Sequence, residues 1–369
     1  MTLQQSCSKV ASRMGGGSGC LPTDASVLME LDASDFEIDT QVAPLGRGSG
    51  CIVFRGKLRN GQNVAVKVVN SQVVEDDAAD NKSNTLSDLR NEIRIGLALP
   101  AHVNLPRFVG VCAGRTSQPQ VLWEMIDGRD LEQLYRLKSK AGKRWCPTQR
   151  HGLEWCVQLF AALDALHACG MVHRDVKPTN IMITSDLMTL KLIDYGLCKN
   201  IGMHEADNEP HRMTGMTGTF RYMAPEVYLG KTYSFPVDIY SGSVVMSFIL
   251  TGVIPSKGID GSTIADLAVR INLRPSLVNI KHRDVREMIA QGWAATPSER
   301  PSARAMHEKL RVIRELRSKT VLGRLSGAAT SFFTSAFSRT QSARSASDGR
   351  VLSASEGQVS QVRGRELQV

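Results

Sequence analysis

The sequence predicts an α+β protein built of two unequal parts, a small β-rich part followed by a larger, mainly helical one. Three observations support this. Between residues 36 and 126, short apolar β-like runs alternate with turns, and one helical stretch near residues 85–99 interrupts them. From about residue 131 to residue 317, the apolar spacing is mainly helical. The two ends of the chain are instead rich in small and polar residues, a composition typical of disorder.

These shifts in composition set the expected boundaries. We expect residues 1–34 to be disordered, because they carry too little apolar surface to offset the entropy of ordering. The ordered domain then covers residues 35–316, with a β-rich lobe over about 35–126 and a helical lobe over about 127–316. Residues 317–369 form a Ser- and Arg-rich tail that we expect to be largely disordered.

Composition and charge exclude several classes of protein. The 369 residues are 42% hydrophobic and 22% charged, which is typical of a globular chain with a sizeable core. The net charge of +9 is spread along the chain, so we expect solvated surface charge and no nucleic-acid partner. No apolar stretch approaches the length of about 18 residues that a membrane span needs. The eight cysteines include no C-x-x-C pair, which suits a reducing compartment, the cytoplasm or the nucleus.

A glycine-rich segment opens the β-rich part. Residues 45–53 read Leu-Gly-Arg-Gly-Ser-Gly-Cys-Ile-Val, and such a run alone is more often a plain β-turn than a phosphate cradle. Its glycines would let backbone N–H groups approach phosphate oxygens. Lys67 ends the next apolar strand, where a charge needs an anionic partner unless the strand end is frayed. Glu92, on the helical stretch that follows, is a candidate partner that would hold the ammonium toward phosphates.

The densest group of charged and amide side chains lies between apolar runs at the start of the helical part. Its members are His173, Arg174, Asp175, Lys177, Asn180 and, after a further apolar run, Asp194. A solvated surface loop is a poor interpretation because the flanking residues are too apolar. Phosphoryl transfer explains the pattern, since a carboxylate must receive the hydroxyl proton and hard oxygen ligands must hold magnesium.

Over about residues 35–316, these motifs resemble the protein kinase family in order and spacing. The resemblance implies a bilobal α+β protein kinase fold, with ATP as co-substrate and Mg²⁺ or Mn²⁺ as cofactor. It implies that Asp175 is the catalytic base and that Lys177 contacts the γ-phosphate. It also implies that Lys67 forms an ion pair with Glu92, and that Asn180 and Asp194 are the metal ligands. The implied ATP-binding residues are Leu45, Gly46, Gly48, Val53, Ala65, Lys67, Trp123, Glu124, Ile126 and Met182.

The resemblance also bears on the substrate. Lys177, and Thr219 in the substrate-facing loop, resemble serine/threonine kinases rather than tyrosine kinases. The run 218–226 looks most like the tyrosine-kinase-like group of serine/threonine kinases, and its Ala-Pro-Glu end implies a protein substrate. Structural roles are implied for three further residues, a buried ion pair for Glu226 with Arg300 and a brace beneath the catalytic loop for Asp238.

The sequence departs from the family pattern at three positions. Cys51 replaces the third glycine of the loop, Gly50 stands where an aromatic residue is usual, and Tyr195 stands where Phe is usual. None of these changes removes a charged catalytic group, so an active serine/threonine kinase in signalling is the first hypothesis. A pseudokinase or scaffold that binds nucleotide or partners without efficient catalysis is the alternative, and a small-molecule phosphotransferase is a third.

Two segments carry candidate phosphorylation sites. Thr214 and Thr217 lie in the activation segment, where a phosphate added by an upstream kinase would bind Arg174 and order the loop. Acidic residues of the same segment could supply that charge instead. In the tail, Ser342 and Ser347 each follow an arginine by three residues, a spacing that basophilic kinases use, but plain Ser-rich disorder is the first interpretation and regulatory phosphorylation the second.

An unusual pair of residues stands at the back of the expected adenine site. Trp123 occupies the gatekeeper position that the resemblance implies, and Gly96 stands one helical turn after Glu92, where a bulky apolar side chain is usual. We expect the indole to fill the volume that Gly96 leaves and to restore contact between the helix, Phe108 and Tyr195. The alternative is an indole that blocks the site.

Overall fold

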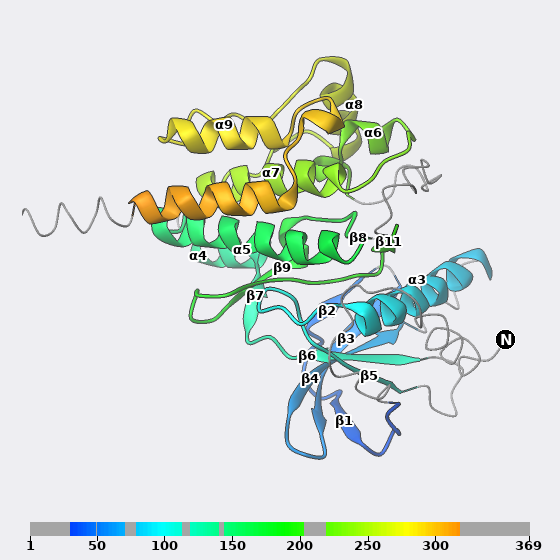
Figure 1. Cartoon of the computed structure of the whole chain (residues 1–369). Coiled ribbons are helices and arrows are strands. Elements are labelled where there is room, and N and C mark those ends of the chain that lie inside the picture. Colours follow the sequence, from blue (N-terminus) through cyan, green and yellow to red (C-terminus); the bar gives the residue numbers. More distant parts are fainter. Residues whose placement is uncertain are drawn as a thin grey trace, which may run out of the picture. The chain divides into compact units, whose positions relative to one another are not determined.

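The computed structural model describes six stretches of the chain, which are residues 30–48, 50–70, 79–112, 119–139, 144–202 and 219–317. The β-rich part precedes the helical part, as the sequence predicts (Figure 1).

The β-rich part is an antiparallel sheet with strand order β1-β3-β4-β6-β5, in which β2 pairs with β3. Its strands are β1 (Phe36–Asp39), β2 (Gly46–Arg47), β3 (Cys51–Leu58), β4 (Asn63–Val69), β5 (Phe108–Cys112) and β6 (Gln120–Glu124). Helix α3 (Ala79–Ala98) packs beside β5, where Figure 1 shows it in cyan. The sequence predicts a helix over residues 85–99, and α3 contains residues 85–98 of that stretch.

The period-two alternation of β4 and β6 gives the sheet two different faces. Val64, Val66 and Leu122 belong to a small core on one face. Trp123 and Val121 belong to the main core, which also contains residues of α3 and of the helical part. The second face is therefore the one that positions the site.

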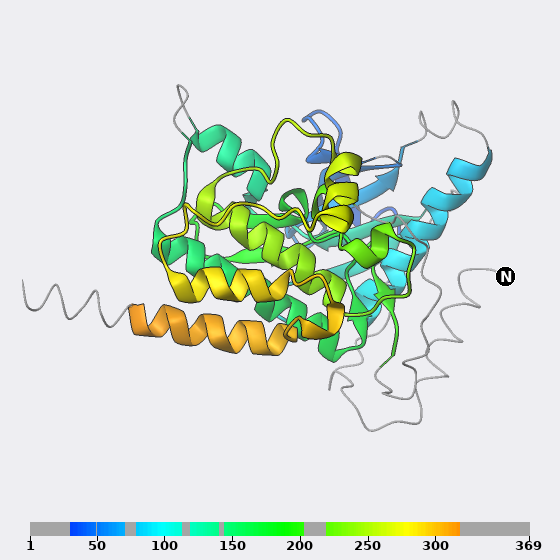
Figure 2. The same cartoon turned by 90° about the horizontal axis from the view of Figure 1, so that it is seen from above.

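The helical part is built around a central helix, α7 (Pro236–Thr251). Fourteen of its sixteen residues are buried, as expected of a helix that is apolar on all sides. Helices α5 (Gln149–Ala168) and α9 (Arg283–Gly292) both pack against α7 (Figures 1 and 2). The remaining helices are α4 (Leu131–Lys138), α6 (Pro225–Tyr228), α8 (Gly261–Arg270) and one over residues 303–317.

Short strands frame the loop that carries the charged cluster. Strand β8 (Met171–Val172) ends where this loop begins, and it pairs with β11 (Lys199–Asn200). The loop closes with a 3-10 turn (Pro178–Asn180) that leads into β9 (Ile181–Thr184), which lies between β7 (Gly128–Asp130) and β10 (Leu190–Leu192). Both ends of the loop are thus fixed by backbone pairing.

The packed part of the chain begins before the predicted boundary at residue 35. Glu30 forms a parallel bridge with Val111, and Leu31 donates its backbone N–H to the Val111 carbonyl at 2.9 Å. Leu31 is also buried in the small core. Leu31 closes the short, mainly apolar run 27–31, which is too short to show a periodicity and is grouped with the polar residues before it.

Membrane-spanning character is absent from the described helices, since none of them is both long and apolar enough to cross a bilayer.

Candidate active site

Asp175 lies in the loop after β8, and its carboxylate is only slightly exposed. Oδ2 accepts a hydrogen bond from Asn180 Nδ2 at 3.0 Å and lies 2.6 Å from Lys177 Nζ. Oδ1 accepts from the backbone N–H and the hydroxyl of Thr219, both at 3.1 Å. The fold therefore brings together a carboxylate, an ammonium, an amide and a hydroxyl that the sequence singled out.

The backbone of this loop is held from below by Asp238 of α7, which is fully buried. Its carboxylate accepts from the backbone N–H groups of His173 at 2.8 Å and Arg174 at 2.9 Å, and it contacts the His167 ring at 2.9 Å. Burial alone would raise the pKa of Asp238, but these hydrogen bonds and nearby histidines lower it. Arg174 has a φ of +67°, and the two backbone hydrogen bonds to Asp238 stabilise this unfavourable conformation.

Asp194 and Asn180 supply oxygen atoms beside this loop. Asp194 follows β10 and also has a positive φ of +67°, and its side chain is 46% exposed. Asn180 donates through Nδ2 to Asp175, so its amide oxygen faces away from that residue. Both are hard donors of the kind that Mg²⁺ prefers. Among the described residues no group of three or more His, Cys, Asp or Glu could hold a metal.

Lys67 of β4 lies between two carboxylates. Its Nζ is 2.6 Å from Glu92 Oε2 on α3 and 2.9 Å from Asp194 Oδ1. Burial would lower the pKa of the Lys67 ammonium, but the two carboxylates outweigh it and raise the pKa. For Glu92, burial raises the carboxyl pKa and Lys67 partly counters it. Lys67 is therefore charged at neutral pH and links the sheet, α3 and the helical part.

Trp123 lies in the main core behind Lys67 and is 8% exposed. Its ring centroid is 5.1 Å from that of Phe108 and 5.5 Å from that of Tyr195, whose ring in turn meets His173 at 5.6 Å. The expected contact among these aromatic side chains is present. One detail differs from the expectation, because the side chain nearest to the missing Cβ of Gly96 is the ring of Phe108 rather than the indole.

The glycine-rich segment turns between β2 and β3. Gly46 pairs with Val53, and the Gly48 N–H donates to the Cys51 carbonyl at 2.8 Å. A Cβ on Gly50 would overlap the side chain of Thr85 on α3, which explains why this position carries no aromatic residue. Burial raises the pKa of the Cys51 thiol to about 11. Close approach of the loop to Thr85 of α3 therefore accounts for the glycine at position 50, and nothing in the structure explains the cysteine at position 51.

The other candidate ATP-binding residues lie on neighbouring elements. Leu45 precedes β2, and Ala65 of β4 pairs with Trp123 of β6. Glu124 ends β6, where its side chain accepts from the Arg107 N–H at 2.9 Å and from Lys191 Nζ at 3.0 Å. Ile126 follows β6, and Met182 lies on β9.

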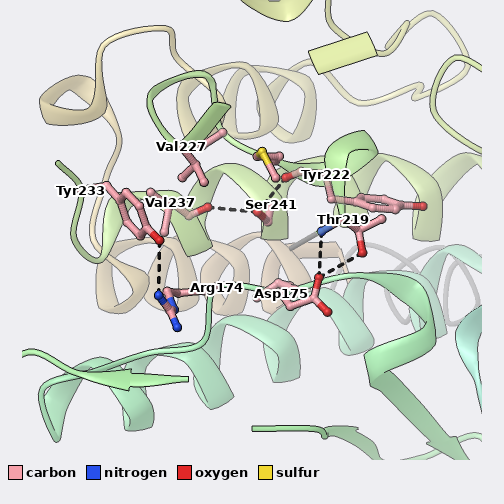
Figure 3. Close-up of a pocket in the computed structure, with 11 residues that line it drawn as sticks. Arg174, Asp175, Thr219, Tyr222, Val227, Tyr233, Val237 and Ser241 are labelled. Carbon is pink, nitrogen blue, oxygen red and sulfur yellow. Dashed lines mark hydrogen bonds between the residues drawn. The ribbon is translucent and has the colours of Figure 1, made fainter. Parts of the chain in front are cut away.

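A small pocket opens beside Asp175 and Thr219 (Figure 3). Its walls are mostly apolar or aromatic and include Tyr222, Val227 and Val237. Arg174 and Tyr233 also line the pocket (Figure 3), and Arg174 Nη1 lies 3.4 Å from the Tyr233 hydroxyl. The pocket is about the size of one water molecule, so in this structure it holds no side chain next to the Asp175 carboxylate.

A second buried ion pair lies in the helical part. Arg300 donates to both oxygens of Glu226, at 2.6 and 2.9 Å, and to the carbonyl oxygens of Ala294 and Pro236. The Arg300 guanidinium also stacks on the Tyr240 ring, with 5.1 Å to its centroid.

Some predicted residues cannot be placed, and one contact escaped sequence reasoning. Thr214 and Thr217 lie outside the described residues, as do the tail serines. Asn91 on α3 donates through Nδ2 to the carbonyl oxygens of Gly196 at 3.3 Å and Cys198 at 2.7 Å. The only hint of this contact in the sequence is that Asn91 is next to Glu92. Its partners are more than 100 residues away along the chain, so motif spacing cannot predict them.

The family model described as protein kinase domain matches residues 40–310. The chain is 26% identical over 299 residues to the human protein named mitogen-activated protein kinase kinase kinase 7, with 80% of this chain and 44% of that protein covered.

Two further relatives carry kinase names. The Arabidopsis thaliana serine/threonine-protein kinase STY17 is 27% identical, with 80% of this chain and 48% of that protein covered. The Dictyostelium discoideum dual specificity protein kinase pyk3 is 28% identical, with 71% of this chain and 18% of that protein covered. The chain spans less than half the length of each of these three relatives.

Proposed function

The chain belongs to the protein kinase family, and we propose that it is an active serine/threonine kinase that transfers the γ-phosphoryl group of Mg-ATP to protein substrates. One observation carries the proposal. The charged residues that phosphoryl transfer needs are in contact as two groups, Lys67 with Glu92 and Asp194, and Asp175 with Lys177. The second group supports transfer over binding alone, because only transfer needs a carboxylate that accepts the hydroxyl proton.

In this proposal each side chain has a distinct task. Asp175 accepts the proton of the substrate hydroxyl, and Lys177 beside it stabilises the negative charge of the γ-phosphoryl group. Lys67 binds the α- and β-phosphates of ATP. Asn180 and Asp194 would hold Mg²⁺, or Mn²⁺, which neutralises phosphate charge when it is bound.

The resemblance at Lys177 and Thr219 supports serine or threonine as the substrate hydroxyl. Thr219 lies beside the catalytic carboxylate, because its N–H and its hydroxyl both donate to Asp175 Oδ1. The Ala-Pro-Glu end of the run 218–226 supports a protein substrate. Together with the run 218–226, these features support a member of the tyrosine-kinase-like group, acting on proteins in signalling.

The reduced cysteines support a location in the cytoplasm or nucleus. Within the described ranges Cys51, Cys146, Cys156 and Cys198 are free thiols.

A pseudokinase remains the second candidate because of the glycine-rich loop. Cys51 replaces its third glycine and the loop tip packs against Thr85, so phosphate cover by this loop differs from the usual arrangement. Weak nucleotide binding without transfer would follow if the loop could not close over ATP.

Phosphotransfer with identification of the product residue tests the proposal. Purified full-length chain is incubated with Mg²⁺, γ-labelled ATP and casein, and the labelled amino acids are separated after hydrolysis. We expect labelled phosphoserine and phosphothreonine, and almost no label with Asp194→Asn. Label on tyrosine would contradict the serine/threonine assignment. A folded wild-type chain that binds ATP and transfers nothing would instead identify the pseudokinase.

A further inference from the structure

The side chain of Trp123 makes a hydrogen bond that the proposed reaction does not require. Indole Nε1 donates to Glu92 Oε1 at 3.1 Å. The other oxygen of the same carboxylate, Oε2, is the one that lies 2.6 Å from Lys67 Nζ. Glu92 thus bridges an indole and an ammonium, one through each oxygen.

The strand register explains why these two donors meet one carboxylate. Trp123 of β6 is directly opposite Ala65 of β4, and Lys67 lies two residues further along β4. Residues 65 and 67 therefore share the sheet face of Trp123, and the indole and the ammonium are diagonal neighbours. Glu92 approaches this face from α3 and fits between them.

The bridge also satisfies groups that would be costly to leave unpaired. Glu92 is 2% exposed and Trp123 is 8% exposed, so little water can reach either. A buried carboxylate is stable only when donors surround its oxygens, and a buried indole N–H needs an acceptor. A phenylalanine at position 123 would keep apolar packing but would remove the donor from Oε1.

Neighbouring contacts hold the indole and the helix in this orientation. Phe108 meets the indole at an interplanar angle of 79°, and Tyr195 packs against it at 38°. Next to Glu92, Asn91 donates to the carbonyl oxygens of Gly196 and Cys198. One edge of α3 is therefore tied to the sheet through Glu92 and to the segment after Asp194 through Asn91.

We propose that Trp123 is a positioning residue of the active site, whose indole N–H holds Glu92 so that Glu92 keeps Lys67 aimed at the phosphates. This inference rests on the proposed function, because it assigns phosphate binding to Lys67. It gives the large residue at the back of the nucleotide site a task beyond filling volume. The indole turns toward α3 and supports catalysis through Glu92.

The hydrogen bond can be detected without any activity. The chain has four tryptophans, and isotope labelling gives one indole N–H resonance for each in a proton–nitrogen spectrum. The resonance of Trp123 is the one that Trp123→Phe removes. In Glu92→Gln we expect this resonance to move upfield, because a neutral amide oxygen is a weaker acceptor than a carboxylate. The Trp155 resonance should stay in place.

Trp155 provides a matched control for kinetics. It is fully buried and its Nε1 donates to the Leu187 carbonyl at 3.0 Å, far along the chain from the site. Below the melting transition, Trp123→Phe should lower kcat and raise KM for ATP, with a loss of about tenfold or more in kcat/KM. Trp155→Phe should lower the Tm and keep kcat/KM within about twofold of wild type.

Two results would overturn the inference. One is a Trp123→Phe enzyme with the kinetics of Trp155→Phe, and the other is a Trp123 resonance that Glu92→Gln does not move. If Trp123→Phe fails to fold, the Trp123 resonance is assigned by elimination, with the single variants Trp145→Phe, Trp155→Phe and Trp293→Phe. The shift of that resonance in Glu92→Gln then decides whether the hydrogen bond exists. If wild type transfers no phosphate, the proposed function fails, and the spectrum still reports whether the indole binds Glu92.

Discussion

Two buried ion pairs within the described part of the chain differ in what surrounds them. Glu226 and Arg300 form a bidentate pair within the helical part, and three backbone carbonyls and the Tyr240 ring complete the Arg300 environment. Lys67 and Glu92 form a single contact between the sheet and α3, and Lys67 also reaches Asp194.

The difference separates a structural pair from a functional one. The Arg300 guanidinium is saturated by protein atoms and its side chain has no exposed surface, so it has no donor left for a ligand. The Lys67 side chain retains 17% exposure, and the Asp194 side chain beside it retains 46%. We infer that the first pair stabilises the fold and that the second contributes to chemistry.

Removal of the Lys67 charge should have the largest effect on activity. Lys67→Met keeps much of the side-chain length but loses the ammonium that binds phosphates, so we expect phosphotransfer to fall by about 10²–10³-fold. The chain should stay folded but with a lowered Tm, because the methionine keeps its place in β4 while the buried Glu92 carboxylate loses its counter-charge. Steady-state kinetics with thermal melting checks both quantities. Near-wild-type turnover would show that the pair has no catalytic role.

Disruption of the other pair should act on stability instead. Glu226→Gln leaves the Arg300 charge buried without its counter-charge, so we expect the free energy of unfolding to fall by about 3–5 kcal/mol. Urea denaturation measures this loss. The double variant Glu226→Gln/Arg300→Met should be more stable than the single variant, because no buried charge is left alone. If the double variant were the less stable one, the pair would not behave as a buried salt bridge.

A smaller loss of stability is expected where α3 meets the sheet. A Cβ on Gly96 would overlap the Phe108 ring, so Gly96→Leu should overpack the interface and cost about 1–3 kcal/mol of unfolding free energy. Addition of Phe108→Ala should recover part of the loss, since it removes the ring that is struck. Equal unfolding midpoints for Gly96→Leu and wild type would contradict this packing.

The smallest expected effect is the pH dependence of the loop brace. The pKa of Asp238 is lowered from 3.8 in the fold, so its ionised form stabilises the native state above pH 3.8. As the pH falls below this value toward the folded pKa, that contribution is lost. Urea denaturation of wild type and Asp238→Asn measures this contribution as a difference in unfolding midpoint. The difference should be constant near neutrality and shrink below about pH 3.8. An advantage that grows in acid would reverse the assigned sign.

Sequence reasoning located most charged groups because local motifs position them. Asp175, Lys177 and Asn180 fall within a single loop, so their contacts follow from short spacing and from the chemistry of the side chains. The Trp123 hydrogen bond could not be predicted in this way. It depends on the β4–β6 register and on the placement of α3, both of which are set by tertiary packing.

The same limit applies to the Phe108 ring at Gly96. Sequence spacing placed Gly96 on the Glu92 face of the helix and called for a large side chain nearby. It assigned the gap to Trp123, whereas the Phe108 ring lies there. Spacing cannot separate the two rings, because these residues pair across β5 and β6.

The rate of phosphoryl transfer by Asp175→Asn tests the central claim most directly. Asparagine keeps the size of the side chain and its contact with Thr219 but cannot accept the hydroxyl proton. We predict that wild type transfers phosphate from Mg-ATP to casein, and that Asp175→Asn, with an unchanged Tm, does so about 10²-fold more slowly or worse. Equal rates for the two proteins would contradict the account.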